Sequence, residues 1–250
     1  MHMYKKLAVA ALILAAVTPA TAQSEGGLTL SAQAEKKIDK KLSVSLEAGM
    51  RTRNDFKTMD RWSLDLGASY KLTKWLKADL GYMLIDQNNH EKINYKTSGA
   101  YDTWRPSYWQ LRHRVYASLT GTVKLGSNFK LALRERWQYT YRPETTTQRW
   151  DFDDETWEDD VRGGKAKHVL RSRLGIAYEK KNALFSPYAN VELYNGWGIQ
   201  KVRYTVGTDI QLNKQHSLTA FYRYSDSRNV AEGDYDPDMH YLGIGYKFKF

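Results

Sequence analysis

The chain has 250 residues, no cysteine and a formal net charge of +10, from 38 Lys and Arg residues against 28 Asp and Glu residues. The lack of cysteine excludes disulfide bonds, thiolate metal sites and thiol nucleophiles. Basic residues are spread through the chain rather than clustered, so we expect no nucleic-acid partner. Aromatic residues make up 13% of the chain and are mostly Tyr and Trp, a composition that membrane interfaces favour.

The start of the chain has the pattern of a secretory signal peptide. Two lysines precede an apolar run, Leu7 to Val17, and small residues follow it up to Ala22. The run is shorter than the roughly 20 residues that a transmembrane helix needs. We therefore expect a signal peptide over residues 1–22, cleavage after Ala22, and one mature domain over residues 23–250.

Apolar and polar residues then alternate in segments, with a period of two that only a β-strand turns into two faces. Each segment is close to the roughly 9–11 residues of a tilted membrane-spanning strand. The segments are Leu42 to Arg51, Arg61 to Leu72, Leu76 to Ile85, Tyr108 to Val123, Phe129 to Arg142, and five that begin at Lys167, Pro187, Val202, Leu218 and Asp238.

Short basic turns alternate with mostly longer connections. The short turns are 37–41, 71–75, 124–128, 179–182 and 212–216, and the other connections are 54–60, 86–107, 143–165, 195–200 and 225–237. Outer-membrane barrels have this alternation, with short turns on the periplasmic side and long loops outside. The sequence therefore predicts an all-β fold, an antiparallel up-and-down transmembrane β-barrel of about 10–12 strands.

Aromatic residues near the strand ends support this prediction. We expect Trp75, Phe129, Tyr178 and Phe250 at the periplasmic rim, and Trp62, Trp109, Tyr139 and Tyr224 at the outer rim. Two such girdles anchor a barrel at both membrane interfaces. A soluble β-sandwich also alternates, but it buries its apolar face and disfavours Trp and Tyr at both ends of its strands.

The segment from Gly27 to Lys37 also alternates, which makes the number of strands odd. Bacterial single-chain barrels have even strand numbers. Three explanations stay open: this segment lies in the lumen, it pairs only partly, or a further strand is hidden in the sequence.

The last segment carries an aromatic stripe on its apolar face. Tyr246, Phe248 and Phe250 share this face with Leu242 and Ile244. The ending resembles the C-terminal signal of outer-membrane β-barrels, which the barrel assembly machinery reads. The resemblance implies that these three aromatic residues are an assembly signal, and that outer-membrane lipid surrounds the barrel.

The opposite, inward parity carries charge. Arg-x-Arg pairs on three consecutive segments predict an arginine ladder along one wall. The predicted lumen-lining residues are Arg112, Arg114, Arg134, Arg136, Arg171, Arg173, Arg203 and Arg223, with Glu47, Asp65, Asp79, Glu192 and Asp209. Charges in an interior must be paired or hydrated. Two interpretations stay open: a lumen filled by these side chains, as in small barrels, and a narrow wet path that favours anions.

Some polar residues lie on the outward parity, and each is a candidate for a catalytic or local structural role. Glu135 shares its face with Leu133, where a carboxylate facing lipid is expensive, and we expect a β-bulge near Arg134 to turn it inward. His168 and Ser172 share the outward face of one strand, and outer-membrane phospholipases carry a Ser and a His on their lipid-facing surface, but no motif here resembles theirs. His168 and Ser172 are separated by roughly 13 Å, beyond hydrogen-bond reach. We interpret His168, like His113 and His240, as an interfacial residue.

The connection from Pro143 to Lys165 is acidic between Asp151 and Asp160 and contains Trp150 and Trp157. Clustered oxygens can hold calcium, but no EF-hand spacing is present. We interpret it as a solvated acidic loop. Its aromatic residues are suited to contact a glycan or a partner protein.

The repeated basic hairpins, Arg-x-Arg pairs such as Arg112/Arg114 and Arg134/Arg136, and the Phe250 ending resemble the uncharacterised outer-membrane β-barrels of the DUF2490 type, found in Gram-negative bacteria of the Bacteroidetes type. The resemblance covers most of the chain. It implies a fold and a location in the cell outer membrane, without an assigned activity.

Three functions agree with these patterns. The first is a narrow porin-like channel for small or anionic solutes. The second is a structural or accessory barrel with a plugged lumen, whose extracellular loops bind a partner or glycan. The third, which fits least, is a membrane enzyme that acts on lipid. We expect no catalytic residue, no cofactor and no metal.

Overall fold

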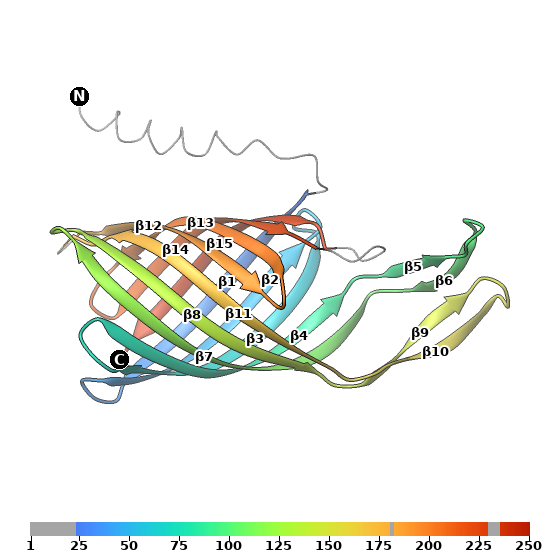
Figure 1. Ribbon diagram of the computed structural model, residues 1–250, viewed down its shortest axis with the longest axis horizontal. Coiled ribbons are helices and arrows are strands. Elements are labelled where there is room, and N and C mark those ends of the chain that lie inside the picture. Colours follow the sequence, from blue (N-terminus) through green and yellow to red (C-terminus); the bar gives the residue numbers. More distant parts are fainter. Residues whose placement is uncertain (1–23, 181–182, 230–235) are drawn as a thin grey trace, which may run out of the picture.

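The computed structural model describes residues 24–180, 183–229 and 236–250, and the expected signal peptide lies outside them. The regular structure of these residues is all β-strand (Figure 1). In the described ranges, no helix has the length and apolar character to cross a membrane. The strands are β1 (Ser24–Lys37), β2 (Leu42–Arg53), β3 (Thr58–Lys71), β4 (Leu76–Asn89), β5 (Lys92–Tyr95), β6 (Tyr101–Arg105), β7 (Tyr108–Leu125), β8 (Phe129–Arg142), β9 (Thr145–Asp151), β10 (Thr156–Arg162), β11 (Lys165–Tyr178), β12 (Phe185–Asn195), β13 (Ile199–Gln211), β14 (His216–Ser227) and β15 (Asp238–Lys249).

Eleven strands close into a barrel in the order β1-β15-β14-β13-β12-β11-β8-β7-β4-β3-β2. Neighbouring strands pair antiparallel, except that β1 and β15 pair in parallel from Ser24/Asp238 to Glu35/Lys249. The predicted all-β barrel of 10–12 strands is therefore confirmed.

The first strand corrects the sequence interpretation. Gly27 to Lys37 neither lies in the lumen nor pairs only partly, because β1 is hydrogen-bonded to β2 on one edge and to β15 on the other. Nor do the described residues contain a twelfth barrel strand. An odd number of strands makes the first and last run in the same direction, so the barrel closes through a parallel pair. Closure leaves no exposed edge, and a parallel pair is only slightly less stable than an antiparallel one.

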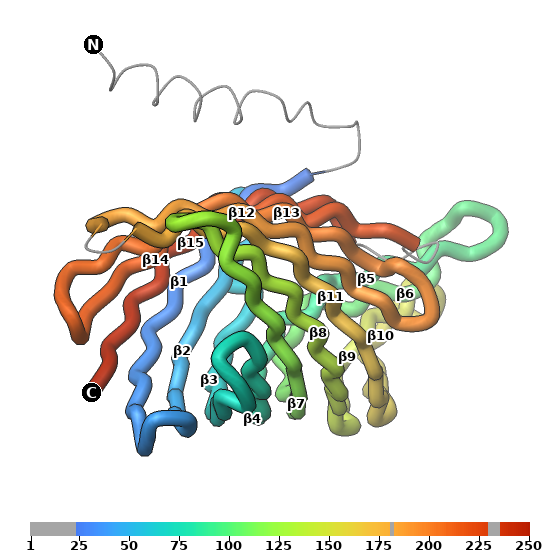
Figure 2. The backbone as a smooth tube through the Cα atoms, turned by 60° about the vertical axis from the view of Figure 1, so that its left-hand side comes forward, coloured from blue at the N-terminus to red at the C-terminus, as the bar shows by residue number. Residues whose placement is uncertain are grey.

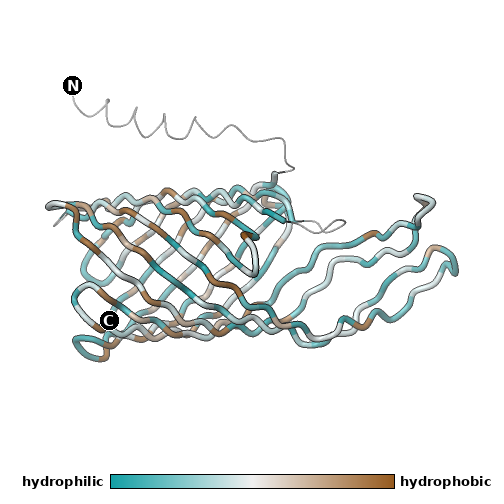
Figure 3. The backbone as a smooth tube through the Cα atoms, in the orientation of Figure 1, coloured by the Kyte–Doolittle hydropathy of each residue, from teal (hydrophilic) through white to brown (hydrophobic). Residues whose placement is uncertain are grey.

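Polar and apolar residues alternate along the barrel strands (Figure 3). The apolar set is exposed on the outside, and the opposite parity lines the interior cavity. Outward side chains such as Leu66 and Leu80 are 58% and 63% exposed. Among the described residues, the buried hydrophobic side chains are Ile85, Val169, Val202, Met239 and Tyr241. A soluble protein buries its large aliphatic residues, whereas a transmembrane barrel presents them to lipid.

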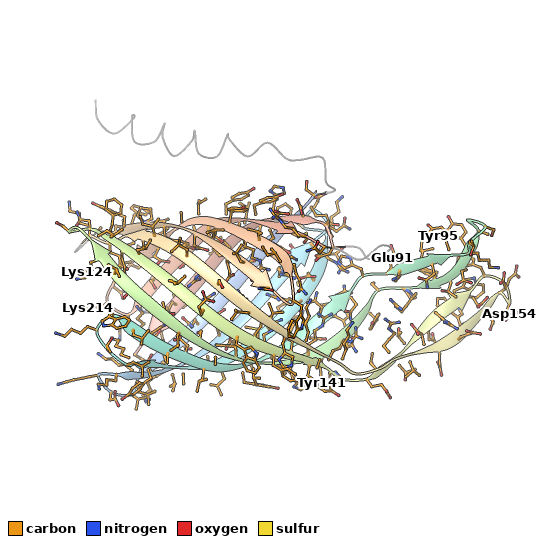
Figure 4. All side chains as sticks on the ribbon, in the orientation of Figure 1. Glu91, Tyr95, Lys124, Tyr141, Asp154 and Lys214 are labelled. Atoms are coloured by element: carbon orange, nitrogen blue, oxygen red, sulfur yellow. The ribbon has the colours of Figure 1, made fainter. Side chains whose placement is uncertain are left out.

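Short turns join the strands at one end of the barrel, where Lys124 and Lys214 lie (Figure 4). Three turns begin with a side-chain oxygen that accepts two backbone N–H groups. Asp39 accepts them at 2.6 and 2.7 Å, Thr73 at 3.2 and 3.0 Å, and Asn213 at 2.9 Å each. These bonds close the turns locally, and they hold the pKa of Asp39 below its ordinary value.

A second sheet extends from the other end of the barrel (Figures 1 and 2). Strands β5, β6, β9 and β10 form it, in the order β10-β9-β6-β5, and we call it the arm. Tyr95 and Asp154 lie at its tips (Figure 4). The sequence predicted loops over 86–107 and 143–165. The structure instead has two hairpins there, and the two hairpins pair with each other. Their strands have 4 to 7 residues and many charged side chains, so they show little apolar alternation.

Inward aromatic rings lie against glycines of the neighbouring strand. A Cβ atom at Gly81 would stand 2.3 Å from the Tyr116 ring, and one at Gly243 would stand 2.0 Å from the Phe221 ring. Only glycine permits this close approach. The rings are thereby held close to the wall.

Candidate functional site in the barrel interior

The barrel interior contains a cavity of about 720 Å³. Its wall consists mostly of polar side chains of the inward parity. The predicted residues that line this cavity are Glu47, Asp65, Arg114, Arg134, Arg136, Arg171, Arg173, Glu192, Arg203, Asp209 and Arg223. The alternation of the strands therefore brings residues from distant parts of the sequence to one cavity.

Arg112 and Asp79 lie apart from this lining. Arg112 donates from Nη2 to the side-chain oxygen of Asn89 at 2.5 Å, near the arm end of the barrel. Asp79 accepts hydrogen bonds from Ser69 at 2.5 Å and Ser118 at 3.2 Å. Both side chains are thus engaged with the wall rather than directed at the cavity.

Glu192 is the carboxylate with the most partners on the cavity wall, and it is 5% exposed. Arg134 Nη2 lies 2.5 Å from Oε1, and Arg171 Nη2 lies 2.8 Å from Oε2. The Tyr194 hydroxyl donates to Oε2 at 3.1 Å. A buried carboxylate requires such partners, because removing its charge from water costs several kcal/mol.

Tyr194 links this carboxylate to a third arginine. The guanidinium carbons of Arg171 and Arg203 lie 4.4 and 4.7 Å from its ring centroid. Arg203 also donates to the Tyr194 hydroxyl and, at 3.1 Å, to Ser225. Cation–π contacts contribute about 0.5–2 kcal/mol each. The sequence prediction does not include the inward tyrosines, although the same alternation places Tyr116 and Tyr194 inside.

Three of the predicted acids occupy a different wall of the barrel from most of the lining arginines. Glu47, Asp65 and Asp79 lie on the adjacent strands β2, β3 and β4, whereas the lining arginines come mostly from β7, β8, β11, β13 and β14. Tyr116 connects the walls: it donates to Asp65 at 2.9 Å, and the Arg136 guanidinium lies 4.1 Å from its ring centroid. Such segregation produces an electric field across the cavity.

Several lining arginines have neutral partners instead of carboxylates. Within the described ranges, no ion pair is found for Arg114, Arg136, Arg173, Arg203 and Arg223. Arg114 Nε donates to Thr140 at 2.9 Å, and Arg223 Nε donates to Thr205 at 3.4 Å. A guanidinium stays protonated. The wall therefore carries an excess of positive charge that water or an anion must meet.

Arg51, Arg61 and Asp60 are charged residues near the arm end that sequence reasoning missed. Arg51 and Arg61 are register partners on β2 and β3. Arg51 pairs with Asp60, which is 4% exposed and also accepts a hydrogen bond from Gln87 at 2.8 Å. The inward parity contains both arginines. Asp60 was hidden because the register shifts between Arg51 and Thr52, which changes the face it occupies.

Comparison with known proteins places this barrel in a family. Residues 27–235 match the family described as "Protein of unknown function (DUF2490)". The chain belongs to the DUF2490 family. No curated protein matches the chain.

Solved structures similar to this DUF2490 chain include two bacterial barrels. The NanC porin is 14% identical, with 90% of this chain and 98% of that chain covered, at a TM-score of 0.48. The beta domain of the Bordetella autotransporter BrkA is 16% identical, with 84% and 82% covered, at a TM-score of 0.49.

On the outside of the DUF2490 barrel, Glu135 faces outward. The ladders of β8 with β7 and with β11 have no register shift, so the bulge expected near Arg134 is absent. Ser172 Oγ donates to Glu135 Oε2 at 2.6 Å. His168 instead packs on the Tyr139 ring, with ring centroids 4.9 Å apart. The described contacts therefore do not bring Ser172 and His168 together.

The other two histidines interpreted as interfacial, His113 and His240, each pair with a tyrosine. His113 Nδ1 lies 2.7 Å from the Tyr82 hydroxyl, and His240 Nδ1 lies 2.6 Å from the Tyr222 hydroxyl. These pairs satisfy polar groups at the edge of an apolar belt. The geometry agrees with interfacial residues in an aromatic girdle.

The arm has one aromatic face and one charged face. Trp104, Trp150 and Trp157 are register neighbours across β6, β9 and β10, and the Trp157 ring centroid lies 5.7 and 5.5 Å from those of Trp104 and Trp150. The other face carries ion pairs, such as Arg105 with Asp160 at 3.1 Å. The arm therefore presents a row of indole rings outside the barrel.

An acidic group closes the turn between β9 and β10. Carboxylate oxygens of Asp151, Asp154 and Glu158 lie within 4.8 Å of one another. Two of them are already engaged: Asp151 accepts the N–H groups of Asp153 and Asp154 at 2.8 and 3.3 Å, and Glu158 pairs with Arg149 at 2.9 Å. The two backbone bonds hold the pKa of Asp151 below its ordinary value. This geometry agrees with a solvated acidic turn.

Proposed function

We propose that this DUF2490 barrel forms a narrow passage for small anions through the cell outer membrane. The observation that carries the proposal is the cavity of about 720 Å³ whose lining arginines exceed its carboxylates. Cationic groups that line a confined aqueous path favour anions over cations. Arg114, Arg173 and Arg223 are the residues assigned to this selectivity, because none of them forms an ion pair with a described carboxylate.

The outward face supports the membrane location. Exposed aliphatic residues cover the barrel between its two ends, and an apolar surface of this extent is stable only against lipid. At the short-turn end, the Phe248 and Phe250 rings stack with centroids 5.4 Å apart, and Tyr246 bonds to His216 at 2.6 Å. We assign this aromatic group to recognition by the barrel assembly machinery.

The alternative function is capture of a surface glycan or partner protein by the arm. The row of Trp104, Trp150 and Trp157 favours it, since indole rings offer large, rigid contact areas with a polar N–H group. In this alternative, the interior side chains fill the lumen and no solute passes.

Planar-bilayer conductance with a salt gradient separates the two functions. The passage predicts small reproducible steps with anion preference. It also predicts that the triple variant Arg114→Gln, Arg173→Gln, Arg223→Gln loses this preference, while Arg149→Gln on the arm keeps it. The absence of conductance steps from a folded barrel overturns the proposed passage and favours capture of a glycan or partner by the arm. Unchanged selectivity in the triple variant overturns the role of the arginines.

A further inference from the structure

A polar pair interrupts the apolar outer surface at the middle of the barrel. Glu135 stands near the midpoint of β8 and Ser172 near the midpoint of β11, and the two are register partners. Their outer neighbours in the ladders are Leu119 on β7 and Leu193 on β12. A carboxyl group facing lipid costs most at the bilayer midplane, so its presence there requires a reason.

The pair has hydrogen-bond capacity that the barrel itself does not use. Ser172 Oγ donates to Glu135 Oε2 at 2.6 Å, and no hydrogen bond to Oε1 is found from the described residues. Hydrocarbon supplies neither donors nor acceptors. A protonated carboxyl group has both a donor and an acceptor. The pair is therefore complementary to a copy of itself.

The leucines around the pair do not select a partner. Lipid tails are as apolar as leucine, so an aliphatic surface gains little from leaving lipid for another barrel. A polar group gains a hydrogen bond that lipid cannot offer. A protein that binds this surface is therefore selected by the polar group that it presents to Glu135 and by the depth of that group in the membrane.

We propose that Glu135 and Ser172 form the centre of a membrane-embedded contact between two copies of this chain. Two copies inserted in one bilayer hold these residues at the same depth, so the groups match without further adjustment. A twofold axis along the membrane normal brings the pairs together, as in other isologous contacts. The carboxyl group of each copy then bonds the carboxyl group of the other, and the leucines of β7, β8, β11 and β12 surround them.

Cysteine cross-linking tests this contact, because the chain has 0 cysteines and thus no background. Leu174 is on β11 beside Ser172 and is 47% exposed, so Leu174→Cys reports the proposed interface. Leu242→Cys is the matched control: Leu242 is 54% exposed and lies on β15, which β12, β13 and β14 separate from β11. Oxidation in lipid vesicles is expected to cross-link the first variant and not the second.

Substitutions in the Leu174→Cys background test the polar pair. Glu135→Leu is expected to lower the cross-linked fraction about tenfold, the effect of losing one to two hydrogen bonds in lipid. Glu135→Gln keeps a donor and an acceptor and is expected to retain cross-linking. Thr208→Leu, on the outward face of β13, is the control. Cross-linking that is absent, equal at Leu242, or unchanged by Glu135→Leu in a barrel with an unaltered circular dichroism spectrum overturns the proposal.

Discussion

The barrel wall and the arm are both antiparallel sheets, yet they assign their two faces differently. In the barrel, residues such as Leu66 face outward and the charges face the cavity. In the arm, a row of tryptophans lies on one face, ion pairs lie on the other, and side chains on both faces are exposed. Alternation with a period of two shows that a sheet has two distinct faces. Whether a sheet encloses an interior cavity depends on whether it closes on itself. The barrel sheet closes and the arm sheet does not.

The ion pairs of the two regions differ in the same way. Glu192 holds two arginines in the barrel with 7% of its side chain exposed, whereas the Arg149–Glu158 pair of the arm is 42% and 35% exposed. Water screens the second pair and not the first. The Arg171–Glu192 and Arg149–Glu158 pairs, at 2.8 and 2.9 Å, therefore contribute different free energies in the two sheets.

Removing one carboxylate from each region is expected to show the largest difference. Glu192→Gln leaves Arg134 and Arg171 inside the barrel without their charge partner, at a cost of about 3–5 kcal/mol. Glu158→Gln in the arm costs less than about 1 kcal/mol. Urea unfolding from lipid vesicles measures both. Equal costs would mean that Glu192 is as well hydrated as a surface group.

Placing one arginine on the apolar face of the barrel wall and one on the apolar face of the arm is expected to give the second largest difference in the free energy of unfolding. Leu66 on β3 and Val161 on β10 are 58% and 60% exposed, so they are matched in accessibility. Leu66→Arg costs about 2–4 kcal/mol, because the guanidinium meets lipid near the midplane. Val161→Arg changes the free energy of unfolding by less than about 0.5 kcal/mol, because it meets water. Similar costs in the same unfolding assay would contradict the lipid exposure of the barrel wall.

Acid is expected to have the smallest effect, a local one in the arm. The pKa of Asp151 is lowered by bonds from the N–H groups of Asp153 and Asp154. Its stabilisation of the turn is therefore complete above the ordinary Asp value of about 3.9 and is lost as the pH falls through the lower folded value. Hydrogen-exchange protection of these two amides is expected to fall over that range.

Two controls accompany the acid experiment. Asp151→Asn keeps an acceptor without a charge and is expected to remove the pH dependence. Asp39 has its pKa lowered in the same way, but its turn joins barrel strands β1 and β2. The amides at Lys41 and Leu42 are expected to lose less protection than those of the arm. Equal losses in both turns would show that the barrel gives no extra support.

Much of the barrel was predictable because its strands are long and one of their faces meets lipid. The inward arginines followed from parity alone, and most of them line the cavity. The arm was not predictable, because strands such as Lys92–Tyr95 are too short to establish a period. Asp60 was missed because a register shift changed its face. The bulge expected near Arg134 is absent, because β8 keeps its register with both neighbouring strands and Glu135 stays outward, where Ser172 donates a hydrogen bond to it.

The sequence by itself determined the class of the fold, the two faces of each long strand and the charge of the inward face. These depend on residues two positions apart, which the chain shows directly. Only the tertiary structure decided how β1 closes on β15, which arginines Glu192 neutralises, and that Glu135 meets Ser172. Each of these depends on the register between strands far apart in the chain, and register is fixed when the whole barrel closes at once.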